Sequence, residues 1–274
     1  MKGQNTNPIQ LLQPYLVLCT DDYQRIIENR NGISHFYEFR AGSGEEGALQ
    51  AVPDGSVDLL FGISENQVRA FIGGTVFQAK AWELPEEELY FGIRFFPGQC
   101  RIPADLKIEE IIDADIEISD DHFIKEFSRQ LLEKETAKER SALFREWYCR
   151  HYSLKEDAAV MLEPYIRNRI YETRGTVSMK QLAEDTGYSA CYIRRVFSRV
   201  HGVPPKVFGK FVRFQNVLEY LTYGNRQSGM VCNDMGGIAM EYGYSDQPHM
   251  IHEFKHYTGT TPEAYMRLVR GYKF

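Results

Sequence analysis

The sequence predicts a two-domain α+β protein. Its amino-terminal part is a β-barrel or sandwich with a helical hairpin, and its carboxyl-terminal part is an all-α domain with two helix-turn-helix motifs. Strand-like segments fill the chain to about residue 105, the hydrophobic period then changes to three and four, and the last third of the chain contains an internal repeat. We expect three parts: residues 1–118, 119–155 and 156–274.

The first part consists of short segments rich in Phe, Tyr, Val and Ile, separated by Gly, Pro, Asp and Asn. They read SHFYEFRA, SVDLLFGIS, VRAFIGGTVFQAKAWEL and LYFGIRFFPG. Between them, PDGS at 53–56 is a turn signal, because Pro presets φ and Gly tolerates positive φ. This regular spacing favours a barrel or sandwich.

The middle part has the apolar spacing of two amphipathic helices. The stripes are Phe123, Phe127, Leu131 and Leu132 in the first helix, and Leu143, Phe144, Trp147 and Tyr148 in the second. Thr136 and Glu139 have the spacing of a capping box at the start of the second helix. The hairpin serves either to close the core of the first domain or as a contact between protomers of a homodimer.

From residue 156 onward the pattern is almost entirely helical. The expected helices are 156–173, 178–186, 189–201, 205–223, 235–242, 245–257 and 262–269. Ser178 and Gln181 have capping-box spacing, and Pro205 and Pro262 stand where proline opens a helix.

Two copies of one pattern lie within this helical part. Leu182, Ala183, Gly187, Tyr188 and Ser189 recur 56 residues later as Ile238, Ala239, Gly243, Tyr244 and Ser245. Phe197, Gly202, Pro205 and Phe208 recur 57 residues later as Phe254, Gly259, Pro262 and Tyr265. Each copy has a small residue four positions before a turn glycine, as two closely crossing helices require. The repeat therefore predicts a helix-turn-helix motif, twice.

Composition and charge set the class of protein. The 274 residues are 43% hydrophobic and 26% charged, with five widely spaced cysteines that we interpret as reduced thiols. The sequence contains neither an apolar run of membrane-spanning length nor a signal-peptide block, so we expect a cytoplasmic protein without membrane contact. Residues 155–274 carry 16 Lys or Arg against 12 Asp or Glu, whereas residues 1–154 carry 16 against 26. A basic part joined to an acidic part is compatible with nucleic-acid binding.

LAEDTGYSACYIRRVFSRVHGVPPKVF and IAMEYGYSDQPHMIHEFKHYTGTTPEAYMR resemble the two halves of the AraC/XylS-type DNA-binding domain. The resemblance covers about residues 156–270 and implies that each second helix enters the major groove of double-stranded DNA, with 206–223 as linking helix. It also implies transcription activation through contact with RNA polymerase. The first part, through PDGSVDLLF and GIRFFPG, resembles the cupin-like sensory and dimerisation domains of such regulators.

The resemblance places base-reading positions at Cys191, Arg194 and Arg195 in the first copy and at Gln247, His249 and His252 in the second. Cys at 191 and Pro at 248 depart from the family pattern, so the target sequence does not carry over. Helical periodicity agrees, because it leaves one outward face in each copy. The candidate DNA-binding residues are Cys191, Tyr192, Arg194, Arg195, Arg199, Gln247, His249, His252, Lys255 and His256.

Other roles for these side chains are open. The arginines could form surface salt bridges, and the three histidines could bind a metal or lie in solvent. We favour DNA contact, because Arg pairs with guanine or phosphate and Gln with adenine. We expect neither a metal site nor a cofactor.

Residues 1–118 contain a single histidine, His35, which argues against a metal-dependent barrel enzyme. We therefore expect no enzymatic activity, but a pocket for a small-molecule effector inside the first domain. The candidate ligand-binding residues are His35, Tyr37, Asp58, Trp82 and Arg94. The alternative is a first domain that binds a protein partner or only dimerises.

Overall fold

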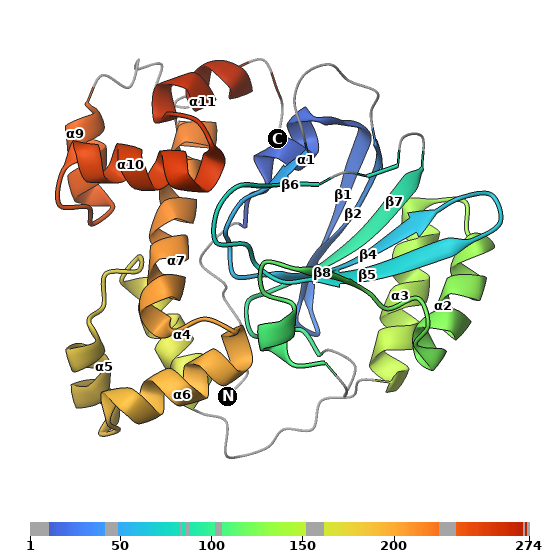
Figure 1. Ribbon diagram of the computed structural model, residues 1–274, viewed down its shortest axis with the longest axis horizontal. Helices are drawn as coiled ribbons and strands as arrows, with labels where there is room; N and C mark the ends of the chain where they lie inside the picture. The colour runs from blue at the N-terminus through green and yellow to red at the C-terminus, as the bar shows by residue number, and fades with distance from the viewer. Residues whose placement is uncertain are drawn as a thin grey trace.

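The computed structural model describes residues 11–41, 49–82, 84–85, 88–101, 106–151, 162–224, 234–270 and 272. Figure 1 shows a β-rich part with a helical hairpin on its far side, and a helical part beside it in which two groups of helices flank one long helix, α7. The predicted fold class, an antiparallel β-domain followed by a helical domain with two helix-turn-helix motifs, is confirmed.

The β-rich part is a six-stranded antiparallel sheet in the order β1-β2-β7-β4-β5-β8, accompanied by the two-stranded ladder β3-β6. The strands are β1 (Thr20–Arg30), β2 (Ile33–Ala41), β3 (Gln50–Ala51), β4 (Val57–Ile63), β5 (Val68–Gly73), β6 (Lys80–Ala81), β7 (Leu89–Phe95) and β8 (Asp115–Glu117). A short 3-10 turn, η1 (Ile108–Glu110), precedes β8.

Side chains alternate between the two faces of the sheet, as strand geometry requires. One face, which includes Phe61, Phe91 and Phe95, packs with the hairpin in one apolar cluster. The opposite face, which includes Tyr37, Phe39 and Tyr90, packs with Leu16 and Leu49 in a second cluster. This second face, called the inner face below, also carries the polar side chains His35, Tyr37, Asp58 and Arg94, whereas Trp82 follows β6.

The hairpin consists of α2 (His122–Leu132) and α3 (Ala137–His151). The capping box at the start of α3 is formed, because the Glu139 amide donates to Thr136 Oγ1 (3.2 Å) and the Thr136 amide donates to Glu139 Oε2 (3.1 Å). The predicted stripe of α2 is partly wrong: Phe123 and Leu132 are exposed, and Ile124 is buried instead. Ile124, Phe127 and Leu131 are spaced by three and four, so they fit one helical face better than the predicted set.

The helical part contains eight α-helices among the described residues. They are α1 (Pro14–Leu18), α4 (Leu162–Glu172), α5 (Met179–Thr186), α6 (Ala190–His201), α7 (Pro205–Glu219), α9 (Met235–Glu241), α10 (Gln247–Thr258) and α11 (Pro262–Val269). A π-helical turn, η2 (Tyr220–Gly224), continues α7. None of the helices in the described ranges is long and apolar enough to cross a membrane.

The helix α1 and the described residues before it bridge the sheet and the helical part. Leu11, Leu12 and Tyr15 lie in the same apolar cluster as the side chains of α7 and α10. Gln215 of α7, which is 1% exposed, accepts from the Leu12 amide (3.0 Å) and donates to the Leu12 and Pro53 carbonyls (3.3 and 2.9 Å). The Tyr15 hydroxyl donates to the Thr258 carbonyl of α10 (2.9 Å). The amino-terminal segment thus completes the core around α7.

Candidate nucleic-acid interface and ligand cavities

The first helix-turn-helix motif is formed by α5 and α6. Gly187 ends α5 in the left-handed conformation (φ 71°), which a residue with a Cβ adopts at a cost. Ser189 then caps α6, because its side chain accepts from the Tyr192 amide (3.3 Å). Gly202 ends α6, again with φ 71°.

The second motif, α9 and α10, repeats this geometry. Gly243 has φ 76°, and Gly259 ends α10 with φ 74°. The cap of α10 is Asp246, which accepts from the His249 amide (2.7 Å), and not Ser245, the residue that sequence similarity pairs with Ser189. The residue gained by the second copy therefore lies in its turn, and positions along α10 correspond to α6 with an offset of 57.

Both second helices have one buried and one exposed face. Ile193 and Phe197 are buried in α6, and Met250 and Phe254 take the equivalent places in α10. All ten predicted DNA-binding side chains are exposed: Cys191, Tyr192, Arg194, Arg195, Arg199, Gln247, His249, His252, Lys255 and His256. With the offset of 57, Tyr192, Arg195 and Arg199 correspond to His249, His252 and His256.

The exposed arginines of α6 are available for a ligand. Within the part of the chain that the structure describes, Arg194, Arg195 and Arg199 form no ion pair. The Arg195 guanidinium lies 5.2 Å from the centre of the Tyr192 ring, which stacks on Tyr188 at 5.0 Å. A cation held over an aromatic face is partly ordered before it binds a partner. The salt-bridge alternative for these arginines is not supported by these contacts.

The histidines of α10 do not gather into a metal site. Among the described residues no group of three His, Cys, Asp or Glu side chains is arranged to hold a metal ion. His249 Nδ1 lies 3.0 Å from Ser245 Oγ, and its ring contacts Tyr244 edge-on at 5.4 Å. His252 and His256 are exposed on the same face of α10.

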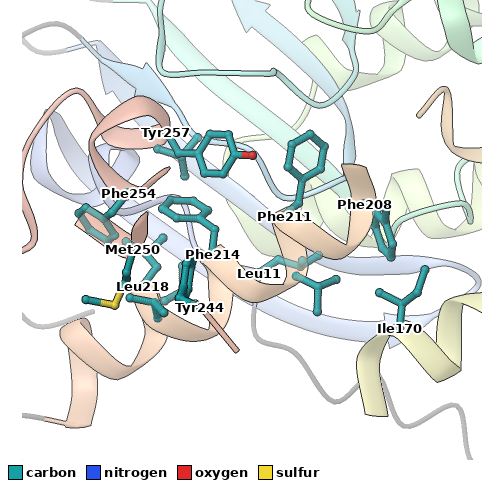
Figure 2. Close-up of a cluster of buried hydrophobic side chains, with 14 of the residues drawn as sticks. Leu11, Ile170, Phe208, Phe211, Phe214, Leu218, Tyr244, Met250, Phe254 and Tyr257 are labelled. Atoms are coloured by element: carbon teal, nitrogen blue, oxygen red, sulfur yellow. The ribbon is translucent and has the colours of Figure 1, made fainter. Parts of the chain in front are cut away.

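The helix α7 connects the two motifs through a continuous apolar row. Figure 2 shows Phe208, Phe211, Phe214 and Leu218 along this helix, with Ile170 beside one end of the row and Met250, Phe254 and Tyr257 beside the other. Fifteen residues of α-helix span roughly 22 Å. Because each motif packs on one part of this rod, the separation of α6 and α10 is set by packing and not by a flexible linker.

Sequence reasoning missed a buried polar cluster at the carboxyl-terminal end of α6. His201 Nε2 donates to Glu163 Oε1 (2.7 Å), which also accepts from Arg167 Nε (2.9 Å), and all three side chains are buried. Burial lowers the pKa of His201 against the opposing pull of Glu163, while hydrogen bonds from His201 and Arg167 lower the pKa of Glu163. The spacing of Glu163 and Arg167 by four was the available signal; the role of His201 had none.

The predicted ligand residues lie on the inner face of the sheet, where a buried ion-pair triad joins two of them. Arg94 Nη1 donates to Asp54 Oδ2 (2.9 Å), and Arg94 Nε donates to Asp58 Oδ1 (3.0 Å). The Tyr37 hydroxyl donates to the same Asp58 oxygen (3.3 Å). Two carboxylates hold one guanidinium, which raises the pKa of Arg94, whereas burial raises the pKa of Asp58. Asp54 was not among the predicted residues.

Two cavities flank this triad. The larger one, of about 590 Å³, is lined by Asp58 and Trp82 together with Leu60, Arg69, Phe71, Lys80, Tyr90 and Asp115. The smaller one, of about 280 Å³, is lined by His35 and Arg94 of the sheet and by residues of α1 and η2. Tyr37 lines neither cavity, because its ring lies across Gly92. His35, Tyr37, Asp58 and Arg94 therefore share a face of the sheet, but the five predicted side chains do not share a cavity.

Part of the helical region is similar to known proteins. Residues 182–268 match the family model of a helix-turn-helix domain. The HTH-type transcriptional activator AarP of Providencia stuartii is 25% identical over 120 residues, which cover 44% of this chain and 78% of that protein.

Two solved structures are also similar to parts of this chain. A probable AraC family transcriptional regulator from Rhodopseudomonas palustris CGA009 is 21% identical, with a TM-score of 0.34 over 39% of this chain and 96% of that one. ToxT from Vibrio cholerae O395 is 11% identical, with a TM-score of 0.40 over 92% of this chain and 96% of that one.

Proposed function

Because the carboxyl-terminal part is the helix-turn-helix domain of an AraC-type DNA-binding transcription regulator, we propose that α6 and α10 read two successive major-groove segments and that the amino-terminal domain controls this binding. The observation that carries the proposal is the matched pair of exposed polar faces, held at the two ends of one rigid helix. Helices of this kind read bases through a few side chains of their outward face.

The proposed contacts differ between the motifs. In α6, Arg194 and Arg195 pair with guanine edges or phosphates, and Arg199 lies one turn further along the helix. In α10, Gln247 in the first turn pairs with adenine, followed by His249 and His252. Cys191, Tyr192, Lys255 and His256 complete the two surfaces. Regulators of this family have no catalytic function, so in this proposal the amino-terminal domain has a sensory role. A small-molecule effector binds at the inner face of its sheet.

We infer that the protein activates transcription through RNA polymerase as a homodimer. The relative named a transcriptional activator supports the direction of regulation. The competing function for the amino-terminal domain is binding of a protein partner. Thermal-shift screening of metabolites compared with pull-down from lysate distinguishes the two.

The DNA-binding proposal is tested by chemical protection. Cys191 lies on the proposed surface, and Cys149, which is also exposed, lies on α3 and serves as the matched control. With a target selected from random DNA, alkylation of Cys191 should slow by about an order of magnitude in the complex, since a side chain in a filled groove excludes reagent. Cys149 should react at the same rate with and without DNA.

Equal alkylation of Cys191 in free and bound protein would contradict the proposed surface. Footprints of the full chain should also show two protected segments on one face of the duplex, about one helical turn or roughly 34 Å apart. Protection on opposite faces would refute the arrangement of the two motifs.

A further inference from the structure

The larger cavity has a defined wall. Its floor is the inner face of β4, β5 and β7, which contribute Leu60, Phe71 and Tyr90, and Trp82 follows β6 on the other side. Trp82 Nε1 is a buried donor without a partner among the described residues. Aromatic walls with one unpaired polar group are typical of small-molecule sites.

The charges around the cavity do not cancel. Lys80 pairs with Asp115 (2.7 Å) and Arg69 with Glu88 (3.7 Å), so each of these pairs is neutral. The triad of Asp54, Arg94 and Asp58 combines two carboxylates with one guanidinium and leaves one negative charge. Asp58 is the member of the triad that lines the cavity, and its side chain is 13% exposed.

A buried carboxylate that is incompletely compensated favours a cation beside it. Both Asp58 oxygens accept from Arg94 and Oδ1 also accepts from the Tyr37 hydroxyl, and burial raises the pKa of Asp58 against these contacts. The chain already places one cation on this wall: the Arg69 guanidinium lies 5.3 Å from the centre of the Phe71 ring.

We propose that the larger cavity binds a small organic cation, an amine on an aromatic or branched apolar body, whose ammonium group pairs with Asp58 and whose body packs against Trp82, Phe71 and Tyr90. This inference rests on the proposed sensory role of the amino-terminal domain and names the class of its effector.

The same triad connects the cavity to the DNA-binding domain. Asp54 Oδ2 accepts from Arg94 and from Gln13 Nε2 (3.0 Å), and the next residue, Gly55, packs so closely on Phe208 that a Cβ there would lie 2.6 Å from the ring. The carbonyl of Pro53 accepts from Gln215. The turn that carries Asp54 therefore rests on α7. A bound cation that moves the Asp58 carboxylate away from Arg94 leaves Arg94 paired with Asp54 alone. The contacts between the turn that carries Asp54 and α7 then change.

The binding test uses Trp82 as the reporter. The chain has two tryptophans, and Trp147→Phe removes the other one, which lies against the opposite face of the sheet. 4-Methoxybenzylamine should change the Trp82 fluorescence saturably. The neutral and anionic probes of similar shape, 4-methoxybenzyl alcohol and 4-methoxybenzoate, should bind at least about ten-fold more weakly, because the alcohol brings no positive charge to Asp58 and the carboxylate is repelled by it.

Two kinds of variant separate charge recognition from loss of folding. Asp58→Asn should weaken the amine about ten-fold or more. Asp58 belongs to a buried triad, so its substitution can also affect folding. Ala81 lines the cavity and is exposed, and it therefore provides a matched pair of substitutions. Ala81→Glu should strengthen amine binding and Ala81→Lys should weaken it, while neither changes the melting temperature of the free protein.

Preferred binding of the carboxylate, equal binding of all three probes, or no saturable signal with the amine up to millimolar concentration would overturn the proposal. The affinity of each variant for the selected DNA is measured in parallel without probe. If DNA binding is intact and the amine fails, this inference alone is wrong; if DNA binding itself is missing, the proposed function fails. Gln215→Met should retain amine binding but lose its effect on DNA affinity.

Discussion

The two helix-turn-helix motifs have the same backbone geometry but differ in the charge of their exposed side chains. Both have a left-handed glycine in the turn, a polar cap and a left-handed glycine at the end of the second helix. On the exposed face, Arg195 and Arg199 of α6 stand where α10 has His252 and His256. An arginine stays charged at every physiological pH, whereas histidine titrates in that range. The two motifs thus carry different side chains at equivalent exposed positions of one fold.

The largest expected effect is the difference in DNA-binding free energy lost on substitution at the equivalent positions Arg195 and His252. Arg195→Ala should cost roughly 1 to 3 kcal/mol of binding free energy, concentrated at one base pair, because the arginine reads a base edge. His252→Ala should cost less, because an imidazole has fewer hydrogen-bond donors than a guanidinium. Binding to a panel of single-base variants of the target measures both. A loss spread evenly over all sequences would make Arg195 a phosphate contact.

Substitution of the two turn glycines should lower the free energy of unfolding by different amounts. Gly187→Ala should destabilise the fold by about 1 kcal/mol, the cost of a left-handed residue, because an added Cβ meets no atom within 4 Å. Gly243→Ala should cost more, since its Cβ would lie 2.3 Å from Thr176 Cγ2. Denaturant unfolding of the two variants provides the measurement, and equal losses would mean that the second turn relaxes freely.

The histidine surface predicts a pH-dependent affinity. If His249, His252 and His256 face phosphates, DNA binding should take up protons, so affinity should rise as the pH falls from about 8 to 6. The salt dependence should steepen by up to roughly one unit for each histidine that becomes a cationic contact. Replacing all three by Gln should flatten both trends without unfolding the protein, because none of them belongs to the core. A profile unchanged by the triple substitution would remove α10 from the interface.

The smallest effect concerns the ends of the two reading helices. His201 of α6 corresponds to Thr258 of α10, and only the former titrates. Its pKa is lower in the folded protein than its ordinary value, so its contribution to stability is present above about pH 6.5 and is lost as the pH falls toward the folded value. His201→Gln should therefore reduce the loss of unfolding free energy between pH 7 and 5, by at most about 1.4 kcal/mol per pH unit. Thr258→Ser, the matched control, should retain the wild-type slope.

Local pattern was sufficient for much of the fold. The repeat and the helical period predicted both motifs and the exposure of Arg195 and His252, because these features depend on residues three to four positions apart. The cap of α10 was not predicted, since Ser245 and Asp246 both cap well and only the backbone geometry decides between them. The choice of Phe123 over Ile124 failed for a related reason: adjacent apolar residues leave the face of a helix ambiguous.

Contacts between distant segments were beyond sequence reasoning. Arg94, Asp58 and Asp54 come from β7, β4 and the turn before β4, so no spacing in the sequence reveals their triad. The hydrogen bond between Leu12 and Gln215 likewise cannot be predicted from the sequence, because the two residues are 203 positions apart. The domain boundaries predicted from the sequence alone assign Leu12 and Gln215 to different domains, although both contribute to the packing around α7.

That shared core constrains how the protein is made. Leu12 and Tyr15 are translated well before their partners Gln215 and Thr258. Domains generally fold in the order in which they are translated. Here the sheet precedes α7 and α10 in the chain, so the packing around α7 has to wait until residues 215 and 258 are translated. A nascent chain interrupted before residue 215 would expose Leu11, Leu12 and Tyr15.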